Sequence, residues 1–249
     1  RRRGSDVYTS LFATASAITA NTSFTASGVQ ALGCPNEKIR IIPMGFFAEM
    51  YRAREKGFLS SSEGLSVLIV ARLVEKKGTK YAIEAVAILK DQGFSVHLRI
   101  AGDGELRAEL EGLIESLKVS DEVELLGWQS SECVVELMRS ADVVLLPSVT
   151  STNGDMEGQA LVLQEAQAVG TPVVSTRHNG IPEGVVDGQT GILVDERDAK
   201  GIADALRQFA RSPVRLKTMS TAAMNFARVK YDQTSLTESW ERQYWDIRN

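Results

Sequence analysis

Two glutamates, eight residues apart, are the residues of this chain best suited to binding a polar ligand. Glu157 and Glu165 stand between an apolar run that ends at Ser148 and a second one over Pro172–Thr176. We expect a loop that turns into a helix at the carboxyl edge of a parallel sheet, where open α/β folds bind their ligands. Helical spacing would separate the two carboxylates by about 12 Å along the axis. That distance suits hydroxyl groups at the two ends of a diphosphate, whereas the alternative is a pair of solvated helix charges.

Two cations are expected at the same edge of the sheet. Arg72 follows the first apolar run of the main segment, and Lys77 follows five residues later, where a helix is expected to start. Arginine can bind phosphate oxygens through two nitrogens, and a helix N-terminus adds a favourable potential for an anion. The pair therefore predicts a diphosphate site. The alternative is that both are surface charges, as Lys76 and Lys80 nearby would be.

Other polar positions give weaker signals. Gly102-Asp103-Gly104 follows an apolar run, but position 107 is Arg, so the three-glycine dinucleotide fingerprint fails and a tight turn is favoured. Leu126 and Gly127 end another run at the ligand edge, where the backbone could contact a base. His178 is the better placed of the two histidines, and Asn179–Glu183 offers a turn that could hold an anion or hydroxyl.

Short apolar runs alternate with helical patterns from Ser66 onward. Continuous apolar strands joined by helices indicate a parallel sheet covered on both faces, hence an α/β, doubly wound fold with a helical C-terminal tail. The expected strands are 67–71, 96–101, 123–126, 143–146, 172–176 and 191–194. The expected helices are 79–92, 104–118, 131–139, 181–185, 199–211, 214–230 and 233–247, besides the helix that carries the glutamates.

The start of the chain has a different pattern. Residues 17–20 and 39–43 are expected to be strands and residues 23–32 a helix. Two strands and one helix cannot form a closed hydrophobic core by themselves. We expect residues 1–47 to be the remnant of a preceding domain and residues 48–65, polar and rich in serine, to be a linker. Residues 66–230 would form the ligand-binding domain, and the aromatic helix within 231–249 packs either on that domain or back across the boundary.

Composition excludes several classes of protein. The 249 residues carry a net charge of −4, so no basic field recruits nucleic acid, and no apolar run approaches the 18 residues of a membrane span. The three arginines at the start favour an exposed end over a lipid contact. Two isolated cysteines suggest neither a metal site nor a disulfide framework and suit a reducing cytoplasm. No nucleophilic triad and no zinc-like spacing can be assembled.

In combination, these motifs resemble the retaining glycosyltransferases of family four, which have the GT-B fold. The resemblance covers about residues 17–194 in consistent order. It rests on Ala71-Arg72-Leu73, Lys77-Gly78, Gly102-Asp103-Gly104, Leu126-Gly127, Pro147-Ser148, Glu157 to Glu165-Ala166, Gly170-Thr171-Pro172 and Gly180-Ile181-Pro182-Glu183. The sequence Gly154-Asp155-Met156-Glu157-Gly158 resembles that of family members that build bacterial exopolysaccharides. The chain would then be the Rossmann-like C-terminal donor-binding half, and residues 1–47 would end an acceptor domain.

The resemblance implies a role for each site residue. Arg72 and Lys77 would hold the donor diphosphate and stabilise the leaving nucleotide, and Glu157 would lie against the donor sugar. Glu165 would bind the ribose hydroxyls, with further donor contacts from Gly158, Gln159, Ala160, Leu126 and Gly127. Gln159 and Ala160 replace the aromatic residue and glycine that are usual there.

The implied reaction moves a sugar from a nucleotide-diphosphate donor to a hydroxyl acceptor with retention at the anomeric carbon. It requires no metal and no cofactor, because the two cations serve the diphosphate. The acceptor would be a saccharide or a lipid-linked saccharide, the site of action the cytoplasm, and peripheral association with the inner membrane face stays open. The chain alone would have little or no activity.

Three alternatives remain at this stage. The first is another enzyme on the same fold, such as a sugar-nucleotide epimerase or a phosphorylase. The second is a non-catalytic nucleotide-sugar-binding module. The third, an NAD-dependent enzyme, is disfavoured by the failed glycine fingerprint.

Overall fold

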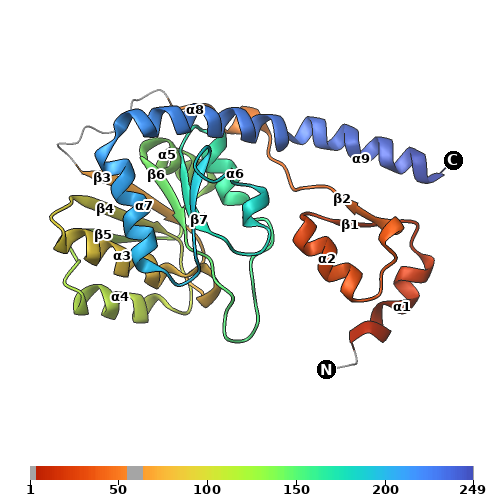
Figure 1. The fold of residues 1–249 in the computed structure, drawn as a ribbon, viewed down its shortest axis with the longest axis horizontal. Coiled ribbons are helices and arrows are strands. Elements are labelled where there is room, and N and C mark those ends of the chain that lie inside the picture. The colour runs from red at the N-terminus through yellow and green to blue at the C-terminus, as the bar shows by residue number, and fades with distance from the viewer. Residues whose placement is uncertain (1–3, 55–63, 249) are drawn as a thin grey trace.

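A six-stranded parallel sheet organises the main segment of the chain. The computed structural model describes residues 4–54 and 64–248, so residues 1–3, part of the expected linker at 55–63 and residue 249 lie outside the description. The sheet has the order β5-β4-β3-β6-β7-β8 (Figure 1). Its strands are β3 Leu65–Val70, β4 Val96–Ala101, β5 Val123–Gly127, β6 Val143–Leu146, β7 Val173–Thr176 and β8 Gly191–Val194. The predicted α/β fold with a parallel sheet is confirmed.

Helices cover both faces of this sheet. The helices are α3 Thr79–Asp91, α4 Arg107–Ser116, α5 Ser131–Ser140, α6 Leu161–Ala168 and α7 Ala199–Arg211. One apolar cluster joins the sheet to α3, α4 and α7, and a second joins it to α5 and α6. Strands β3 and β6 are apolar on both faces, since each is sandwiched between these two layers. The sheet is therefore doubly wound, as predicted.

The strand order changes direction between β3 and β6. The chain runs from β3 outward to β4 and β5, then returns to pair β6 with the other side of β3. The loops that follow β3 and β6 consequently leave the sheet edge in opposite directions. We call the position between them the β3–β6 crevice, because open α/β folds bind ligands at such a reversal of strand order. Arg72 and Lys77 belong to the first of these loops and Glu157 to the second.

The first segment forms a small separate layer. It consists of α1 Gly4–Thr14, β1 Ile18–Ala20, α2 Ser23–Ala31 and β2 Ile39–Ile41, with β1 and β2 paired in parallel. The strands and α2 match the expected pattern, whereas α1 was not predicted. Its sequence contains glycine, serine, threonine and valine, which have low helix propensity, so it gives little helical signal.

The C-terminal helices lead back toward this first segment. Helix α8 Pro213–Lys230 packs beside α6, and α9 Gln233–Arg248 extends beyond the sheet toward β1 and β2 (Figure 1). Trp240 and Tyr244 of α9 share a cavity of about 450 Å³ with Ala17 and Arg40. A backbone bridge between Phe46 and Asp232 joins the two segments at the start of α9.

One expected helix differs in type. The 181–185 stretch is only a 3₁₀ turn, Ile181–Glu183, which ends at Gly184.

Candidate functional site

The two loops at the β3–β6 crevice meet through two ion pairs. Lys77 pairs with Glu157, and both side chains are about 15% exposed. Lys76 Nζ lies 3.1 Å from Asp155 Oδ1. Because Gly78 Cα faces the carbonyl of Pro147, where a Cβ would overlap it, glycine allows the β3 loop to approach the end of β6. The structure thus brings predicted residues Lys77 and Glu157 into contact.

A tight turn fixes the loop ahead of Glu157. The Ser151 hydroxyl lies 2.7 Å from both Asn153 Oδ1 and the Asp155 carbonyl, and the amide of Asp155 donates to Asn153 Oδ1 at 2.8 Å. The hydroxyl and amide of Thr152 donate to Glu75, on the β3 loop. The loop is therefore cross-linked internally and to the opposite side of the crevice.

Arg72 is an exposed cation at this rim. The Lys76 hydrogen bond holds the pKa of Asp155 below its ordinary value, and the charge of Arg72 adds to that effect. Arg72 is thus close enough to act on the same acidic loop. Three positive side chains, Arg72, Lys76 and Lys77, gather on the β3 side of the crevice. Lys76, expected as a surface charge, is paired with Asp155.

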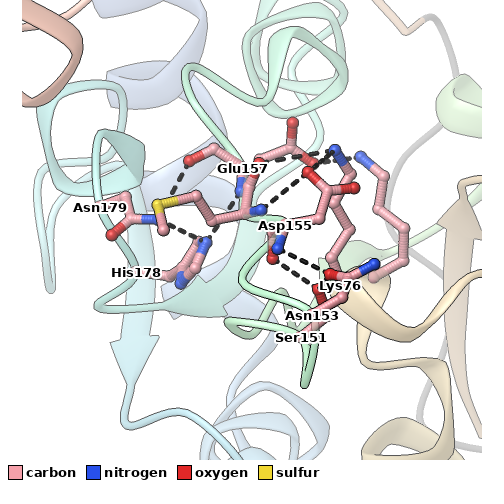
Figure 2. Close-up of polar contacts among 9 residues, drawn as sticks. Lys76, Ser151, Asn153, Asp155, Glu157, His178 and Asn179 are labelled. Carbon is pink, nitrogen blue, oxygen red and sulfur yellow. Dashed lines mark hydrogen bonds and ion pairs between the residues drawn. The ribbon is translucent and has the colours of Figure 1, made fainter. Parts of the chain in front are cut away.

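The backbone of Glu157 is held from its other side by the loop after β7. Its amide donates to His178 Nε2 at 3.0 Å, and Asn179 Nδ2 donates to its carbonyl at 3.3 Å. His178 Nδ1 lies 2.6 Å from Glu196 Oε1. Figure 2 shows His178 and Asn179 on one side of Glu157 and Asp155, with Lys76 on the other.

Glu196 is a second residue that the sequence did not single out. Burial opposes its charge, but hydrogen bonds from His178 and the Thr150 amide hold its pKa below the ordinary value. Its position just after β8, at the same sheet edge, was the available signal.

Glu165 lies in different surroundings from Glu157. Helix α6 begins only at Leu161, so Glu157 is on the loop and the expected helical rise between the two carboxylates is wrong. Glu165 accepts a hydrogen bond from the hydroxyl of Tyr51 at 2.7 Å. Burial raises the pKa of the Glu165 carboxyl, and the Tyr51 hydrogen bond partly offsets that shift. Tyr51 itself was missed, because a tyrosine in an irregular segment carries no periodic signal.

The residues at the start of α6 have structural ties. The Gln159 side chain donates to the carbonyl of Met44 and accepts from its amide, both at 2.7 Å. Ala160 has φ 56°, and no side chain caps the start of α6 among the described residues, where the Leu163 amide donates to the Ala160 carbonyl at 2.9 Å. Gly158 lies against Asn21 and Thr25 of the first segment. The Gln159 side chain is therefore committed to the backbone rather than free for a ligand.

Leu126 and Gly127 lie farther along the sheet edge. They end β5, which β4 and β3 separate from β6. The Leu126 carbonyl accepts from Gln129, and the Gly127 carbonyl accepts from the Gly102 amide at 2.7 Å. The structure shows no bond between these residues and the Lys77–Glu157 pair in the part of the chain it describes.

The Gly102-Asp103-Gly104 turn packs against the β3 loop. A Cβ on Gly102 would overlap the carbonyl of Ala71, and one on Gly104 would overlap the backbone of Leu73. Both glycines are thus explained by close backbone approach, in agreement with the tight-turn interpretation.

Glu183, in the stretch considered as an anion cradle, caps a helix instead. Its carboxylate accepts from the amides of Ser23 and Phe24 at 2.9 and 3.1 Å, at the start of α2. Within the described residues there is no cluster of three or more potential metal ligands, and no helix is long and apolar enough to cross a membrane.

Lys76 and Lys77 on the β3 loop meet Asp155 and Glu157 on the β6 loop where the strand order of the sheet reverses, which is the position where open α/β folds bind ligands. Residues 51–226 match the family model "Glycosyl transferases group 1", and the chain belongs to that family.

Relatives with described roles agree with this membership. The chain is 45% identical over 186 residues to "Putative colanic acid biosynthesis glycosyltransferase WcaL" of Salmonella typhimurium strain LT2, covering 75% of this chain and 45% of the relative. It is 39% identical over 203 residues to "Amylovoran biosynthesis glycosyltransferase AmsK" of Erwinia amylovora, covering 82% and 49%. The chain spans about half the length of the curated relatives it matches.

Solved structures share the fold. The Anabaena protein Alr3699/HepE, crystallised with UDP and glucose, superposes with a TM-score of 0.80 at 23% identity, over 92% of this chain and 63% of that one. Sucrose-phosphate synthase from Thermosynechococcus elongatus superposes with a TM-score of 0.82 at 20% identity, over 98% and 61%. The fold is thus that of GT-B glycosyltransferases.

Proposed function

We propose that this chain is the donor-binding part of a retaining glycosyltransferase. The enzyme would transfer a sugar from a nucleotide-diphosphate donor to a hydroxyl acceptor during exopolysaccharide synthesis, as the names of the colanic acid and amylovoran relatives suggest. The observation that carries the proposal is the meeting of Lys77 with Glu157 across the β3–β6 crevice. It supports a site with a cationic side for phosphate and an acidic side for sugar hydroxyls.

The cationic side would act on the leaving group. As the bond between the sugar and the diphosphate lengthens, negative charge grows on the phosphate oxygens. Arg72 and Lys77 would stabilise that charge. The backbone amides at the start of α6 would add to this effect, because the N-terminal end of a helix dipole is positive. A diphosphate that reaches Lys77 competes with Glu157 for the ammonium group, which would release the Glu157 carboxylate toward the sugar.

The acidic side would orient the donor. Glu157 would accept hydrogen bonds from the sugar. Glu165 would accept hydrogen bonds from the ribose hydroxyls, which would replace its present bond from the Tyr51 hydroxyl. Gly158 and Ala160 would contribute backbone contacts, and Leu126 and Gly127 would contact the base from the end of β5. Gln159 would act indirectly, by holding Met44 and with it the segment that enters this domain.

The remainder of the proposal concerns the whole protein. Residues 66–230 would form the donor domain and 1–47 the end of an acceptor domain, with 48–65 linking them and 231–249 crossing back. The acceptor would be a saccharide, free or lipid-linked, and the reaction cytoplasmic, at or near the inner membrane face. Both cysteines, Cys34 and Cys133, are free, which suits that compartment.

Charge removal in the full-length protein tests the cationic side. Arg72→Ala and Lys77→Ala should each weaken UDP binding in calorimetry and lower nucleoside diphosphate release from the donor by about a hundredfold or more. Lys80→Ala, an exposed lysine on α3, is the control and should leave both unchanged. A panel of UDP, GDP and ADP identifies the base, and NMR of the product's anomeric proton tests retention. Near-normal turnover of both variants would refute the proposal.

A further inference from the structure

The loop that carries Glu157 is fixed through its backbone by two consecutive side chains. The amide of Glu157 donates to His178 Nε2 and its carbonyl accepts from Asn179 Nδ2. Both peptide groups around this residue are thus held from the end of β7 by His178 and Asn179 (Figure 2). Its carboxylate is held by Lys77 from the end of β3. Asn179 has φ 48°, a conformation that asparagine tolerates better than most residues.

The hydrogen bonds show which ring nitrogen of His178 carries the proton. A backbone N–H can only donate, so Nε2 must accept from the amide of Glu157, and Asn179 Nδ2 approaches the same nitrogen at 2.8 Å. Nδ1 therefore carries the proton and donates to Glu196 at 2.6 Å. The imidazole is completely buried, and Glu196 is in turn held by the Thr150 amide and Arg197. A ring with both nitrogens bonded in this way has one orientation.

We propose that His178, oriented by Glu196, is a positioning residue that fixes the peptide of Glu157 and so directs its carboxylate at the donor sugar. The inference rests on the proposed function, since it needs Glu157 in the donor site. The alternative is that His178 only fills the core between β7 and the loop. A core role predicts a loss of stability alone, whereas positioning predicts a loss of turnover in protein that still folds and binds nucleotide.

Two substitutions of His178 test its hydrogen bond to the Glu157 amide separately from its hydrogen bond to Glu196. In His178→Asn, the side-chain amide can take the place of Nδ1 and donate to Glu196, but nothing reaches the Glu157 amide. In His178→Gln, the longer side chain can place its oxygen near the site of Nε2 and accept from that amide. His97→Asn, on the exposed face of β4, is the matched control.

The experiment uses the full-length protein and measures nucleotide binding and sugar transfer separately. UDP binding by calorimetry reports the nucleotide end and the integrity of the fold. Release of nucleoside diphosphate from a panel of UDP-, GDP- and ADP-linked hexoses, with kcat and KM determined separately, reports the sugar end. We expect His178→Asn to lower kcat about ten- to a hundredfold with the UDP dissociation constant within about twofold, because a displaced reacting group acts on the chemical step. His178→Gln should recover most of the loss, and His97→Asn should match the wild type.

Three outcomes decide the matter. Unchanged kcat in His178→Asn overturns the positioning role. Equal loss of kcat in His178→Asn and His178→Gln, together with a lowered melting temperature in both, assigns His178 to the core and also overturns it. If Arg72→Ala and Lys77→Ala retain normal UDP binding and turnover, the proposed function itself fails, and that result is distinct from either of the others.

Discussion

Glu165 is a carboxylate whose surroundings oppose its charge. Burial raises its pKa, so above that pKa the folded protein holds a charge that the unfolded chain would hydrate better. The destabilisation is present at neutral pH and disappears as pH falls through the raised pKa. We expect Glu165→Gln to unfold at a higher temperature than the wild type near pH 7, with a gain that shrinks as the pH falls through the raised pKa of Glu165.

The same substitution should weaken the proposed ribose contact, because an amide oxygen is a poorer acceptor than a carboxylate. We expect UDP binding to weaken by about tenfold in calorimetry. Tyr51→Phe serves as the control for stability: it removes the hydroxyl that stabilises the carboxylate, so it should lower the melting temperature at neutral pH. A Glu165→Gln protein that binds UDP normally would exclude this residue from the ribose site.

Residue types and strand ends were sufficient to predict that Lys77 and Glu157 would lie near one another. Both follow strands of a parallel sheet, and the edge at which such strands end is common to all. Glu196, just after β8, carried the same signal, whereas Tyr51 could not be predicted in the same way. The Tyr51–Glu165 bond joins residues 114 positions apart through an irregular segment, whose path no periodicity in the sequence specifies.

The β3 loop and helix α3 depend on the glycine between them. Gly78 has φ 64°, and a Cβ there would overlap the carbonyl of Pro147 at the end of β6. Gly78→Ala should therefore combine backbone strain with a forced separation of the two loops, at a cost of about 2 kcal/mol or more, and should weaken UDP binding through displaced Lys77. Denaturant unfolding and calorimetry measure the two effects.

Gly93, beyond the other end of the same helix, is the matched control. It has φ 77°, but a Cβ there would meet nothing within 4 Å. Gly93→Ala should cost only about 1 kcal/mol of backbone strain and leave UDP binding intact. Equal effects at the two glycines would show that the contact with β6 is unimportant.

The strands of the sheet were predictable because each is a short, largely apolar run, and β3, β6, β7 and β8 are buried on both faces. The turn at Ile181–Glu183 was harder to assign, since a 3₁₀ turn and a short helix share the same start signals. The start of α6 was misjudged for a related reason. Glycine at 158 and the left-handed Ala160 delay the helix, and only tertiary contacts at Gln159 show why the chain takes that course.

Glu183 connects three parts of the molecule. Its carboxylate caps α2 in the first segment, and its carbonyl accepts from Lys230 and Tyr231, where α8 ends and the chain turns toward α9. The first segment thus contacts the turn that follows β7, one strand away from the proposed donor crevice. This arrangement couples the orientation of α2 to the sheet edge.

Removing the Glu183 carboxylate should loosen that coupling without affecting the donor site. In Glu183→Ala the amides of Ser23 and Phe24 lose their acceptor, at a cost of about 1 kcal/mol typical of a lost helix cap. Hydrogen exchange at these two amides should accelerate about fivefold, while UDP binding stays unchanged, because the carbonyl contacts of residue 183 remain. Glu183→Gln keeps an acceptor oxygen and should show most of the wild-type protection. Unaltered exchange in Glu183→Ala would mean that the cap contributes nothing to the attachment of α2, and that the first segment is held by its other contacts, those of Gln159 with Met44 and of Phe46 with Tyr231.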